Sequence, residues 1–353
     1  MIRARRISVL VVDDSAFMRK ALKRMLTSDP MITVAGDARD GLEAIQKVKE
    51  LKPDVVTLDV KMPGMDGLEA LKRIMKECPT PVLMVSSLTS EGGALTLSAL
   101  AAGAVDFIDK SSCHTHMDIL DIAESLVQKV KVIAGVDVNN LVRSESRLEP
   151  VPVFPRPPVV LGEENPTHLV AIGSSTGGPM SLEKVLSVIP GNYPGAILVV
   201  QHMPAGFTRP FAERLNQQCL MEVSEAQEDD LIGPGRIYIA PAGYHLKLSP
   251  SGDRFRVLLS RMPQDTPHCP SVDVMMESVA EEWPGKILAV ILTGMGNDGT
   301  KGAQAIKRRG GRVIAQNEET CVVFGMPRAV YLTGCVDRMV PLEKVSSEIY
   351  IFR

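Results

Sequence analysis

The chain has 353 residues, of which 45% are hydrophobic and 23% charged, and its formal net charge is -3. This length exceeds what one hydrophobic core comfortably holds, so we expect two domains. The composition is that of a globular protein, and the slightly negative charge argues against nucleic acid or an anionic membrane as a partner.

The chain begins MIRARRISVLVVDDS, with arginines before a short apolar run. The run, residues 7–12, is too short for a signal peptide or a membrane span and ends at two aspartates. We therefore expect a cytoplasmic protein with no membrane insertion. The six cysteines lie far apart with no C-x-x-C pair, which favours free thiols over a zinc site or disulfides.

The first 134 residues alternate short β-branched runs with longer amphipathic segments. Five such βα repeats predict a parallel sheet with helices on both faces. The expected strands are residues 7–12, 32–35, 55–59, 81–86 and 104–108.

Charged residues stand at the ends of three of these strands. Asp13 and Asp14 follow the first, Asp59 ends the third and Lys110 follows the fifth. Ligands bind outside the carboxyl ends of the strands in such sheets, and clustered carboxylates there suit Mg²⁺ and a phosphoryl-accepting aspartate. The alternative is that Asp13 and Asp14 cap a helix from Ser15 and that Asp59 and Lys110 are surface charges. Three charged strand ends in one unit favour the functional interpretation.

The segments VLVVDDS, DVVTLDVKMPGMDG, PVLMVSS and GAVDFIDK resemble the four signatures of two-component receiver domains, over about residues 7–132. The resemblance implies that a chemotaxis histidine kinase supplies a phosphoryl group to Asp59. It also implies a Mg²⁺ site formed by Asp13, Asp14, Asp59 and the carbonyl of Lys61. The residues that it assigns to the response to the phosphate are Ser86, Phe107 and Lys110.

A segment with six prolines and no usable period, VRSESRLEPVPVFPRPPVVLGEENP, then interrupts the βα alternation. This composition is typical of an extended, semi-rigid linker. We predict a first domain of residues 1–135, a linker of residues 136–166 and a second domain of residues 167–353.

The βα alternation resumes in the second domain, which predicts a doubly wound, mostly parallel Rossmann-like sheet. Residues 221–259 indicate a hairpin-rich insertion. The expected strands are residues 169–172, 196–200, 237–240, 286–292 and 312–315. The expected helices are residues 180–188, 207–216, 272–282 and 300–309.

The stretch HLVAIGSSTGGP runs from an apolar strand into a Gly-rich turn. It lacks the lysine of a phosphate-binding Walker loop, and no such loop occurs elsewhere in the chain. Aligned with G-x-S-x-G, it is a strand-to-helix elbow that presents Ser175 rather than Ser174 as a nucleophile. An ordinary βα turn is an equally good interpretation of this pattern alone.

A serine nucleophile needs a base, and position along the chain leaves three histidines, His202, His245 and His268. His202 follows the next expected strand, so it would lie beside Ser175. Asp298 follows the strand KILAVIL and would supply the orienting acid, although it could simply cap the next helix. The order Ser, His, Asp differs from that of α/β-hydrolases.

Six segments of this domain are similar to the catalytic domain of chemotaxis protein-glutamate methylesterases (the CheB family): AIGSSTGGP, VVQHMPAGFTRPFAERLN, YIAPAGYH, PSVDVMM, ILTGMGNDG and AQNEETCVVFGMPR. The similarity implies a triad of Ser175, His202 and Asp298. It places Thr176, Met295 and His268 around substrate.

This resemblance implies an esterase that demethylates glutamate methyl esters on chemoreceptors and deamidates glutamines. The esterase step would need no cofactor, and we expect a monomer. The competing hypothesis is a non-enzymatic regulator whose GSSTGG turn binds an anion or a partner. A DNA-binding output is disfavoured because no basic recognition helix occurs in the sequence.

Overall fold

The computed structural model describes residues 5–86, 90–110, 116–136, 138 and 165–352. The chain divides into two compact units, Met1–Glu149 and Pro150–Arg353. This division falls inside the predicted linker, most of which lies outside the described residues. The limits 135 and 167 therefore stay predictions. None of the helices in the described part of the chain has the length and hydrophobicity of a membrane span.

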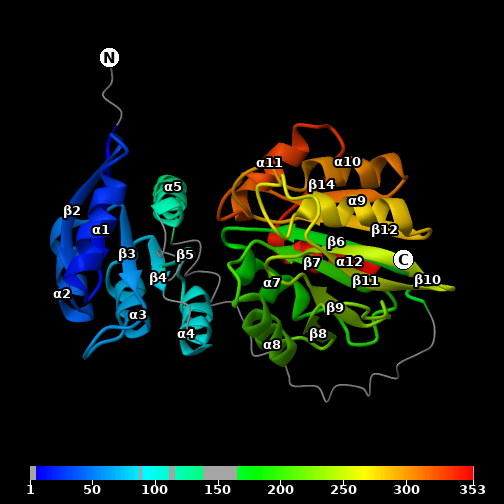
Figure 1. The fold of residues 1–353 in the computed structure, drawn as a ribbon, viewed down its shortest axis with the longest axis horizontal. Coiled ribbons are helices and arrows are strands. Elements are labelled where there is room, and N and C mark those ends of the chain that lie inside the picture. Colours follow the sequence, from blue (N-terminus) through cyan, green and yellow to red (C-terminus); the bar gives the residue numbers. More distant parts are fainter. Residues whose placement is uncertain (1–4, 87–89, 111–115, 137, 139–164, 353) are drawn as a thin grey trace. The chain divides into compact units, whose positions relative to one another are not determined.

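The first unit contains a five-stranded parallel sheet in the order β2-β1-β3-β4-β5 (Figure 1). Helix α1 packs against α5, and α3 packs against both α2 and α4. The strands are β1 (Ile7–Val12), β2 (Ile32–Ala38), β3 (Val55–Asp59), β4 (Val82–Ser86) and β5 (Asp106–Asp109). The helices are α1 (Ala16–Leu26), α2 (Gly41–Leu51), α3 (Gly67–Glu77), α4 (Ser90–Ala101) and α5 (His116–Ile133).

The second unit contains a seven-stranded sheet in the order β14-β13-β12-β6-β7-β9-β8, in which every pairing is parallel, and a separate antiparallel hairpin, β10-β11. The strands are β6 (His168–Ser174), β7 (Ala196–Gln201), β8 (Glu222–Glu225), β9 (Arg236–Ile239), β10 (His245–Ser251), β11 (Arg254–Ser260), β12 (Lys286–Ile291), β13 (Arg312–Gln316) and β14 (Arg338–Val340). The helices are α7 (Gly178–Leu186), α8 (Thr208–Gln218), α9 (Val272–Glu282), α10 (Thr300–Arg308), the 3₁₀ turn η1 (Glu318–Thr320), α11 (Met326–Tyr331) and α12 (Leu342–Ile351). Figure 1 shows α9 and α10 on one face of the sheet and α7 and α8 on the other.

The predicted doubly wound α/β architecture is confirmed for both units. The prediction of a hairpin-rich insertion over residues 221–259 is wrong in its first half. Strand β9 confirms the strand expected at residues 237–240, and β8, which was not expected, also belongs to the main parallel sheet. Within this segment β10 and β11 form a hairpin. Strand β8, of sequence EVSE, buries only Val223. It is a short edge strand, which needs little apolar sequence because one side remains unpaired.

Each sheet has a point at which consecutive connections leave in opposite directions. In the first sheet this point lies between β1 and β3, and in the second between β6 and β12. Crevices at the carboxyl ends of such strands are the usual ligand sites of α/β proteins. Four of the candidates named from the sequence lie there: Asp13 follows β1, Asp59 ends β3, Ser175 follows β6 and Asp298 lies in the loop after β12.

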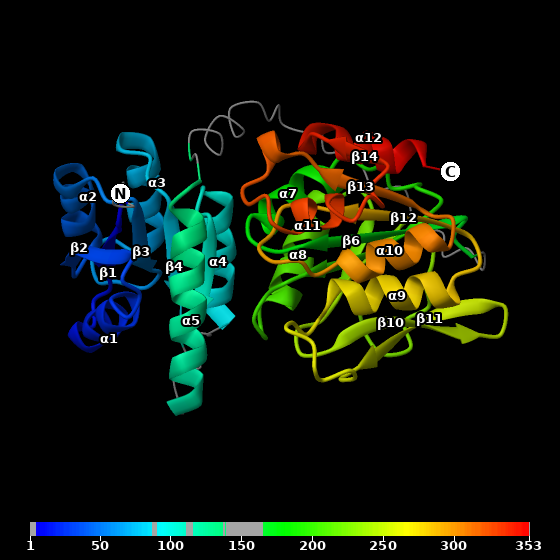
Figure 2. The same ribbon diagram turned by 90° about the horizontal axis from the view of Figure 1, so that it is seen from above.

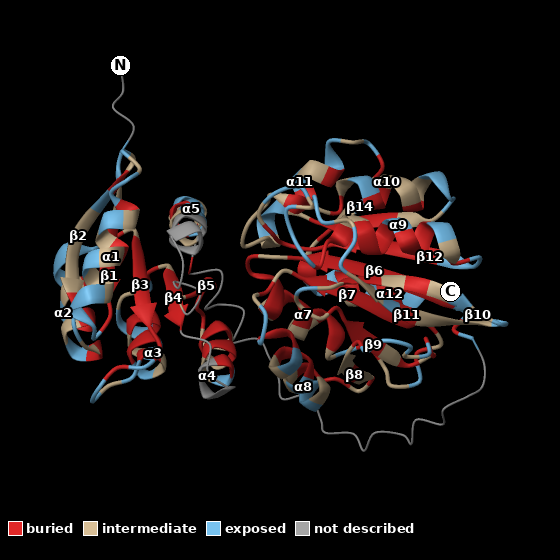
Figure 3. Ribbon diagram, viewed as in Figure 1, coloured by how far each residue is buried: buried red, intermediate tan, exposed pale blue. Residues whose placement is uncertain are grey.

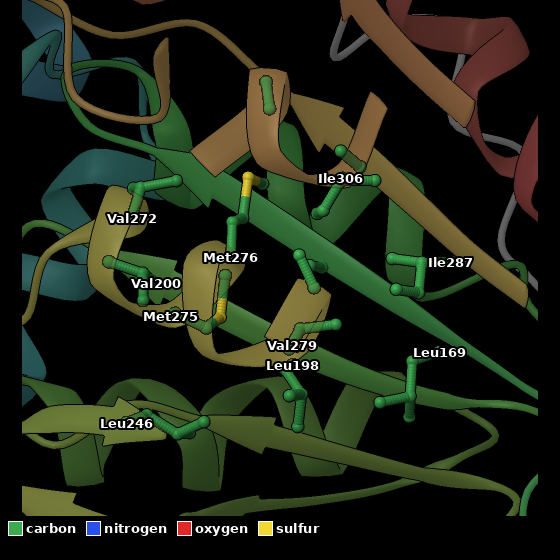
Figure 4. Close-up of a cluster of buried hydrophobic side chains, with 14 of the residues drawn as sticks. Leu169, Leu198, Val200, Leu246, Val272, Met275, Met276, Val279, Ile287 and Ile306 are labelled. Carbon is green, nitrogen blue, oxygen red and sulfur yellow. The ribbon is translucent and has the colours of Figure 1, made fainter. Parts of the chain in front are cut away.

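The main core of the second unit lies on the α9 face of the sheet. Val272, Met275, Met276 and Val279 of α9 pack against β-strand side chains and against Leu246 of the hairpin (Figure 4). Helix α9 therefore lies between α10 and the hairpin (Figure 2), and the strands beneath it are buried along their length (Figure 3). This packing fixes the first residues of α9, which contact the candidate active site.

The close approach of α9 and α10 predicts the effect of one substitution, Gly302→Ala. A methyl group at Gly302 of α10 would lie 2.5 Å from Cβ of Met276 and 3.0 Å from the carbonyl oxygen of Asp273. Alanine in a helix interior normally stabilises, but here we expect a loss of about 1–3 kcal/mol because α9 and α10 must separate. Chemical denaturation measures the loss. The exposed neighbour Lys301→Ala serves as control, and a stabilised Gly302→Ala protein would contradict this packing.

Candidate functional site

The two serines of the elbow have different environments. Ser174 ends β6, is fully buried, and its hydroxyl donates to Oε1 of Gln201 at 2.7 Å. Ser175 is half-buried at the start of the turn, where its backbone N–H donates to the carbonyl of Thr293. Gly177 makes the turn possible with a φ of 76°. The Ser174 hydroxyl is occupied in the core, which leaves Ser175 as the candidate nucleophile.

His202 lies beside this turn because β6 and β7 are neighbours. Ser174 pairs with Gln201, and the backbone N–H of His202 donates to the Ser174 carbonyl at 3.1 Å. Nε2 of the His202 ring lies 2.9 Å from Oδ2 of Asp298. Among the residues that the structure describes, the buried Nδ1 has no hydrogen-bond partner. The ring thus contacts the acid through Nε2 and keeps Nδ1 for another group.

Asp298 follows β12 and accepts hydrogen bonds on both carboxylate oxygens. Oδ2 accepts from His202 and, at 2.7 Å, from the backbone N–H of Val272. Oδ1 accepts from the hydroxyl of Ser271 and the backbone N–H of Asp273, each at 2.9 Å, and from Gly299. Asp298 therefore caps α9, which precedes it in the chain, as well as holding His202. The alternative considered from the sequence, a cap of the next helix, is wrong, because the N-cap of α10 is Gly299, without a side-chain cap.

Burial opposes ionisation of Asp298, but the hydrogen bonds from His202, Asp273 and Val272 outweigh it and hold its pKa well below the ordinary value. The carboxylate is therefore charged throughout the range in which histidines titrate. It can stabilise a positive charge on the His202 ring.

The other residues expected around substrate lie in three separate segments. Thr176 is buried in the elbow, where its carbonyl accepts from the hydroxyl of Thr293 at 3.0 Å. Met295 is half-buried in the loop between β12 and Asp298. His268 is exposed and stacks on His202, with ring centroids 4.0 Å apart and planes inclined by 29°. The structure thus brings His268 to the base.

The sequence reasoning missed Gln201 as part of this site. Its Nε2 donates to the carbonyls of Ser175 and His202, at 2.9 and 3.0 Å, while Oε1 accepts from Ser174. This one buried amide ties the elbow to the end of β7. A methyl group at Gly178 would lie 1.9 Å from Oε1, which explains a glycine there. A polar residue at the last position of a buried strand was the available signal.

The first unit brings three carboxylates together at its sheet edge. One oxygen from each of Asp13, Asp14 and Asp59 lies within 4.8 Å of the others. Nζ of Lys110 contacts Asp13 at 2.9 Å and Asp59 at 2.7 Å. The helix that follows β1 is capped by Ser15 through Met18, not by Asp13 or Asp14. This oxygen set fits Mg²⁺.

Burial raises the pKa of Asp59, and the nearby charge of Asp13 adds to this effect, whereas Lys110 and a backbone hydrogen bond from Lys61 oppose it. Burial also favours the neutral amine of Lys110, yet hydrogen bonds to Asp59 and Asp13 keep its pKa above the ordinary value. Lys110 therefore stays charged and offsets the repulsion between the carboxylates.

The remaining residues of the predicted phosphate response are Ser86 and Phe107, on the two neighbouring strands β4 and β5. Ser86 ends β4, is buried, and accepts a backbone hydrogen bond from Lys110 at 2.7 Å. Phe107 in β5 is 3% exposed, with Nζ of Lys129 5.9 Å from its ring centroid. The phenyl ring is therefore buried.

The chain is similar to known proteins over nearly its whole length. Residues 170–349 match the family model described as CheB methylesterase, and residues 9–120 match the model described as response regulator receiver domain. A protein-glutamate methylesterase/protein-glutamine glutaminase from Thermotoga maritima is 46% identical, with 97% of both chains covered. One from Nitratidesulfovibrio vulgaris is 44% identical over 97% of this chain and 98% of that protein.

A solved structure also resembles the second unit. The crystal structure of the Thermotoga maritima CheB methylesterase catalytic domain matches with a TM-score of 0.51 at 43% identity. The match covers 53% of this chain and 98% of that one.

The hydrogen bonds of Asp298 predict that Asp298→Asn affects both stability and activity. Both carboxylate oxygens accept from backbone N–H groups, those of Val272 and Asp273. In either orientation of the asparagine amide, its –NH₂ group would therefore face an N–H donor. We expect a loss of about 1–3 kcal/mol in unfolding free energy, because a buried donor loses its acceptor. Turnover should fall by about 10⁴-fold, as when the acid of a Ser-His-Asp triad is neutralised. Denaturation curves and ester hydrolysis measure the two effects.

The exposed residue Asp253 supplies the control, because Asp253→Asn removes a charge without disturbing the site. An Asp298→Asn protein with native stability and a native rate would show that neither role of the carboxylate is needed.

Proposed function

The chain belongs to the CheB methylesterase family, and on that premise we propose that it is a phosphorylation-regulated serine hydrolase of chemoreceptors. It would hydrolyse γ-glutamyl methyl esters and convert receptor glutamines to glutamates. The observation that carries the proposal is the hydrogen bond between His202 and Asp298 beside the Ser175 elbow. A helix cap alone would not require a histidine at that place.

The proposed reaction is acyl transfer through Ser175. Oγ of Ser175 attacks the ester carbonyl while His202 takes its proton, and the methoxy group leaves as methanol with that proton. Water then attacks the glutamyl-enzyme ester, His202 again acting as base, and releases glutamate. With ammonia as the leaving group, the same steps deamidate glutamine.

The base nitrogen in this proposal is Nδ1 of His202. Nε2 carries the proton that is donated to Asp298, so the neutral ring has its lone pair on Nδ1. Nδ1 is also the atom without a partner in the described part of the chain. Protonation during catalysis then places the positive charge next to the ionised Asp298.

We also propose roles for the residues that surround this triad. Thr176 follows the nucleophile in the elbow, Met295 lies in the adjacent loop, and His268 covers one face of the His202 ring. They would line the substrate site and the environment of the developing oxyanion. The esterase step would use these side chains without a cofactor.

In the first domain, Asp59 would be the phosphoacceptor and a chemotaxis histidine kinase the donor. Asp13, Asp14, Asp59 and the Lys61 carbonyl would hold Mg²⁺, which supplies positive charge to the incoming phosphoryl group. Lys110, Ser86 and Phe107 would respond to the phosphate. We propose a monomeric protein that acts in the cytoplasm, where receptor signalling tails are accessible.

The competing hypothesis, a regulator whose elbow binds an anion, makes a different experimental prediction. A fluorophosphonate should label Ser175 if the proposal is correct. Tight binding of a phosphate compound without labelling would favour the regulator.

We expect Ser175→Ala to abolish methanol release from methylated receptor membranes, because no other hydroxyl of the elbow is presented. Ser174→Ala should keep measurable turnover but lose about 1–3 kcal/mol of stability, since Oε1 of Gln201 loses its buried donor. Initial rates and thermal unfolding of both variants provide the measurement. An inactive Ser174→Ala protein beside an active Ser175→Ala protein would reverse the assignment.

Phosphorylation of Asp59 should raise the esterase rate by relieving inhibition exerted by the first domain. A fragment without residues 1–140 should then be at least about fivefold faster than the unphosphorylated full chain, within the usual range of allosteric coupling. The esterase rate of the fragment should also stay the same when a phosphodonor is added. Methanol release measures both proteins, and the full-length Asp59→Asn variant controls for effects of the donor itself. A fragment no faster than the resting chain would indicate activation through contacts that the first domain supplies.

A further inference from the structure

His245, one of the three histidines considered as a base, is committed to other hydrogen bonds. It begins β10 and is fully buried. Its Nε2 donates to the carbonyl of Pro263 at 3.0 Å and lies 3.4 Å from Oγ1 of Thr266. Its Nδ1 accepts from the backbone N–H of Ser271 at 3.1 Å. The ring is therefore the neutral Nε2–H tautomer. Neither nitrogen is available to take a proton from Ser175.

Through its hydrogen bond with Ser271, His245 is connected to Asp298, the acid of the proposed triad. Ser271 is the N-cap of α9, and its hydroxyl donates to Oδ1 of Asp298 at 2.9 Å. The next two residues, Val272 and Asp273, donate their backbone N–H groups to the same carboxylate. Three of the hydrogen bonds to Asp298 thus come from the short segment whose first N–H is held by His245.

Through its hydrogen bond with Pro263, His245 is connected to the loop that carries His268, the other neighbour of His202. Residues 261–271 form the loop between β11 and α9, and His245 bonds to both ends of it. This loop carries His268, which stacks on the His202 ring. Thr266 in the same loop donates to the carbonyl of His268 at 3.0 Å. One buried imidazole therefore fixes the segments that contact both Asp298 and His202.

We propose that His245 is a positioning residue for the esterase reaction, which holds Asp298 and the His268 loop so that the His202 ring is correctly oriented. The inference rests on the proposed function of Ser175, His202 and Asp298. Of the His245 hydrogen bonds, the one from Ser271 matters most, because it lies on the side of the acid.

The charge state of His245 agrees with this role. Burial lowers the pKa of His245, which keeps the ring neutral and preserves the acceptor at Nδ1. A protonated ring would present a second donor to the Ser271 N–H. Lys247 disfavours that proton as well, whereas the carbonyl of Pro263 and the charge of Asp298 favour it.

Two substitutions separate the hydrogen bonds of His245 in the full-length protein. His245→Asn can place an amide oxygen near Nδ1 and keep the acceptor for Ser271, whereas His245→Gln can place an amide nitrogen near Nε2 and keep only the donor to Pro263. His168→Gln is the matched control. His168 is equally buried and bonds through Nε2 to Tyr193 at 2.7 Å, but it begins β6 at the opposite end of the strand from Ser175.

We expect kcat of His245→Gln to fall by at least about tenfold with KM nearly unchanged, because a small displacement of an orienting group acts on the transition state. His245→Asn should lose several-fold less, and kcat of His168→Gln, per folded molecule, should match that of the native protein. The rate of fluorophosphonate labelling at Ser175 should follow the same order. Thermal unfolding supplies the folded fraction of each variant.

The low-field proton resonance of the His202 Nε2–H, identified by its loss in His202→Gln, gives a readout that is independent of activity. It should shift or broaden in His245→Gln and stay in place in His168→Gln. Equal kcat values for the two glutamine variants, or an unmoved resonance, would reduce His245 to a residue that only stabilises the fold. A native protein that neither hydrolyses esters nor reacts at Ser175 would overturn the proposed function, and the resonance would still decide whether His245 positions His202.

Discussion

The second domain depends on the carboxylate of Asp298, whose side chain is 11% exposed. Asp298 accepts from the backbone of α9, from Ser271, from Gly299 and from His202, so it joins the loop after β12, the start of α9 and the end of β7. A largely buried charge without such donors would lower the free energy of unfolding. The hydrogen bonds that make the charge tolerable are also those that aim the histidine. A substitution of Asp298 therefore changes both the stability of the domain and the orientation of the His202 ring.

Around this carboxylate, buried polar side chains define the elbow. Gln201 joins the carbonyls of Ser175 and His202, and Thr293 bonds to the carbonyls of Thr176 and Val323. The bond from Gln201 adds to the one that the Ser175 carbonyl already accepts from the backbone N–H of Gly178. The chain has little room there, as a methyl group at Gly294 would lie 2.9 Å from Cβ of Ser175. The serine is thus presented by a turn that is held from several sides.

The first domain uses the same type of sheet edge for a different electrostatic purpose. Asp13 and Asp59 are both buried and would repel one another without the ammonium group of Lys110 between them. Asp13 also accepts a hydrogen bond from the backbone N–H of Ser15 at 2.9 Å. In the proposed function this site would take a cation and a phosphoryl group, whereas the site of the second domain would carry out proton transfer.

The sequence by itself determined the two α/β domains, the family and the strand ends at which Ser175, His202 and Asp298 lie. Strand periodicity and the residues just after each strand are local signals, so they can be read from short stretches of chain. The strands that the sequence did not predict, β8 (EVSE) and β14 (RMV), are edge strands too short to show a period.

Only the tertiary structure decided which atoms meet. It showed that His202 uses Nε2 toward Asp298, that Asp298 caps the preceding helix α9, and that His245 is bonded to Pro263 and Ser271. These contacts join residues from 18 to 96 positions apart, through single side chains that repeat no pattern. Such pairings are fixed by how helix α9 and the β10-β11 hairpin pack on the sheet, and packing is a property of the whole domain rather than of any segment.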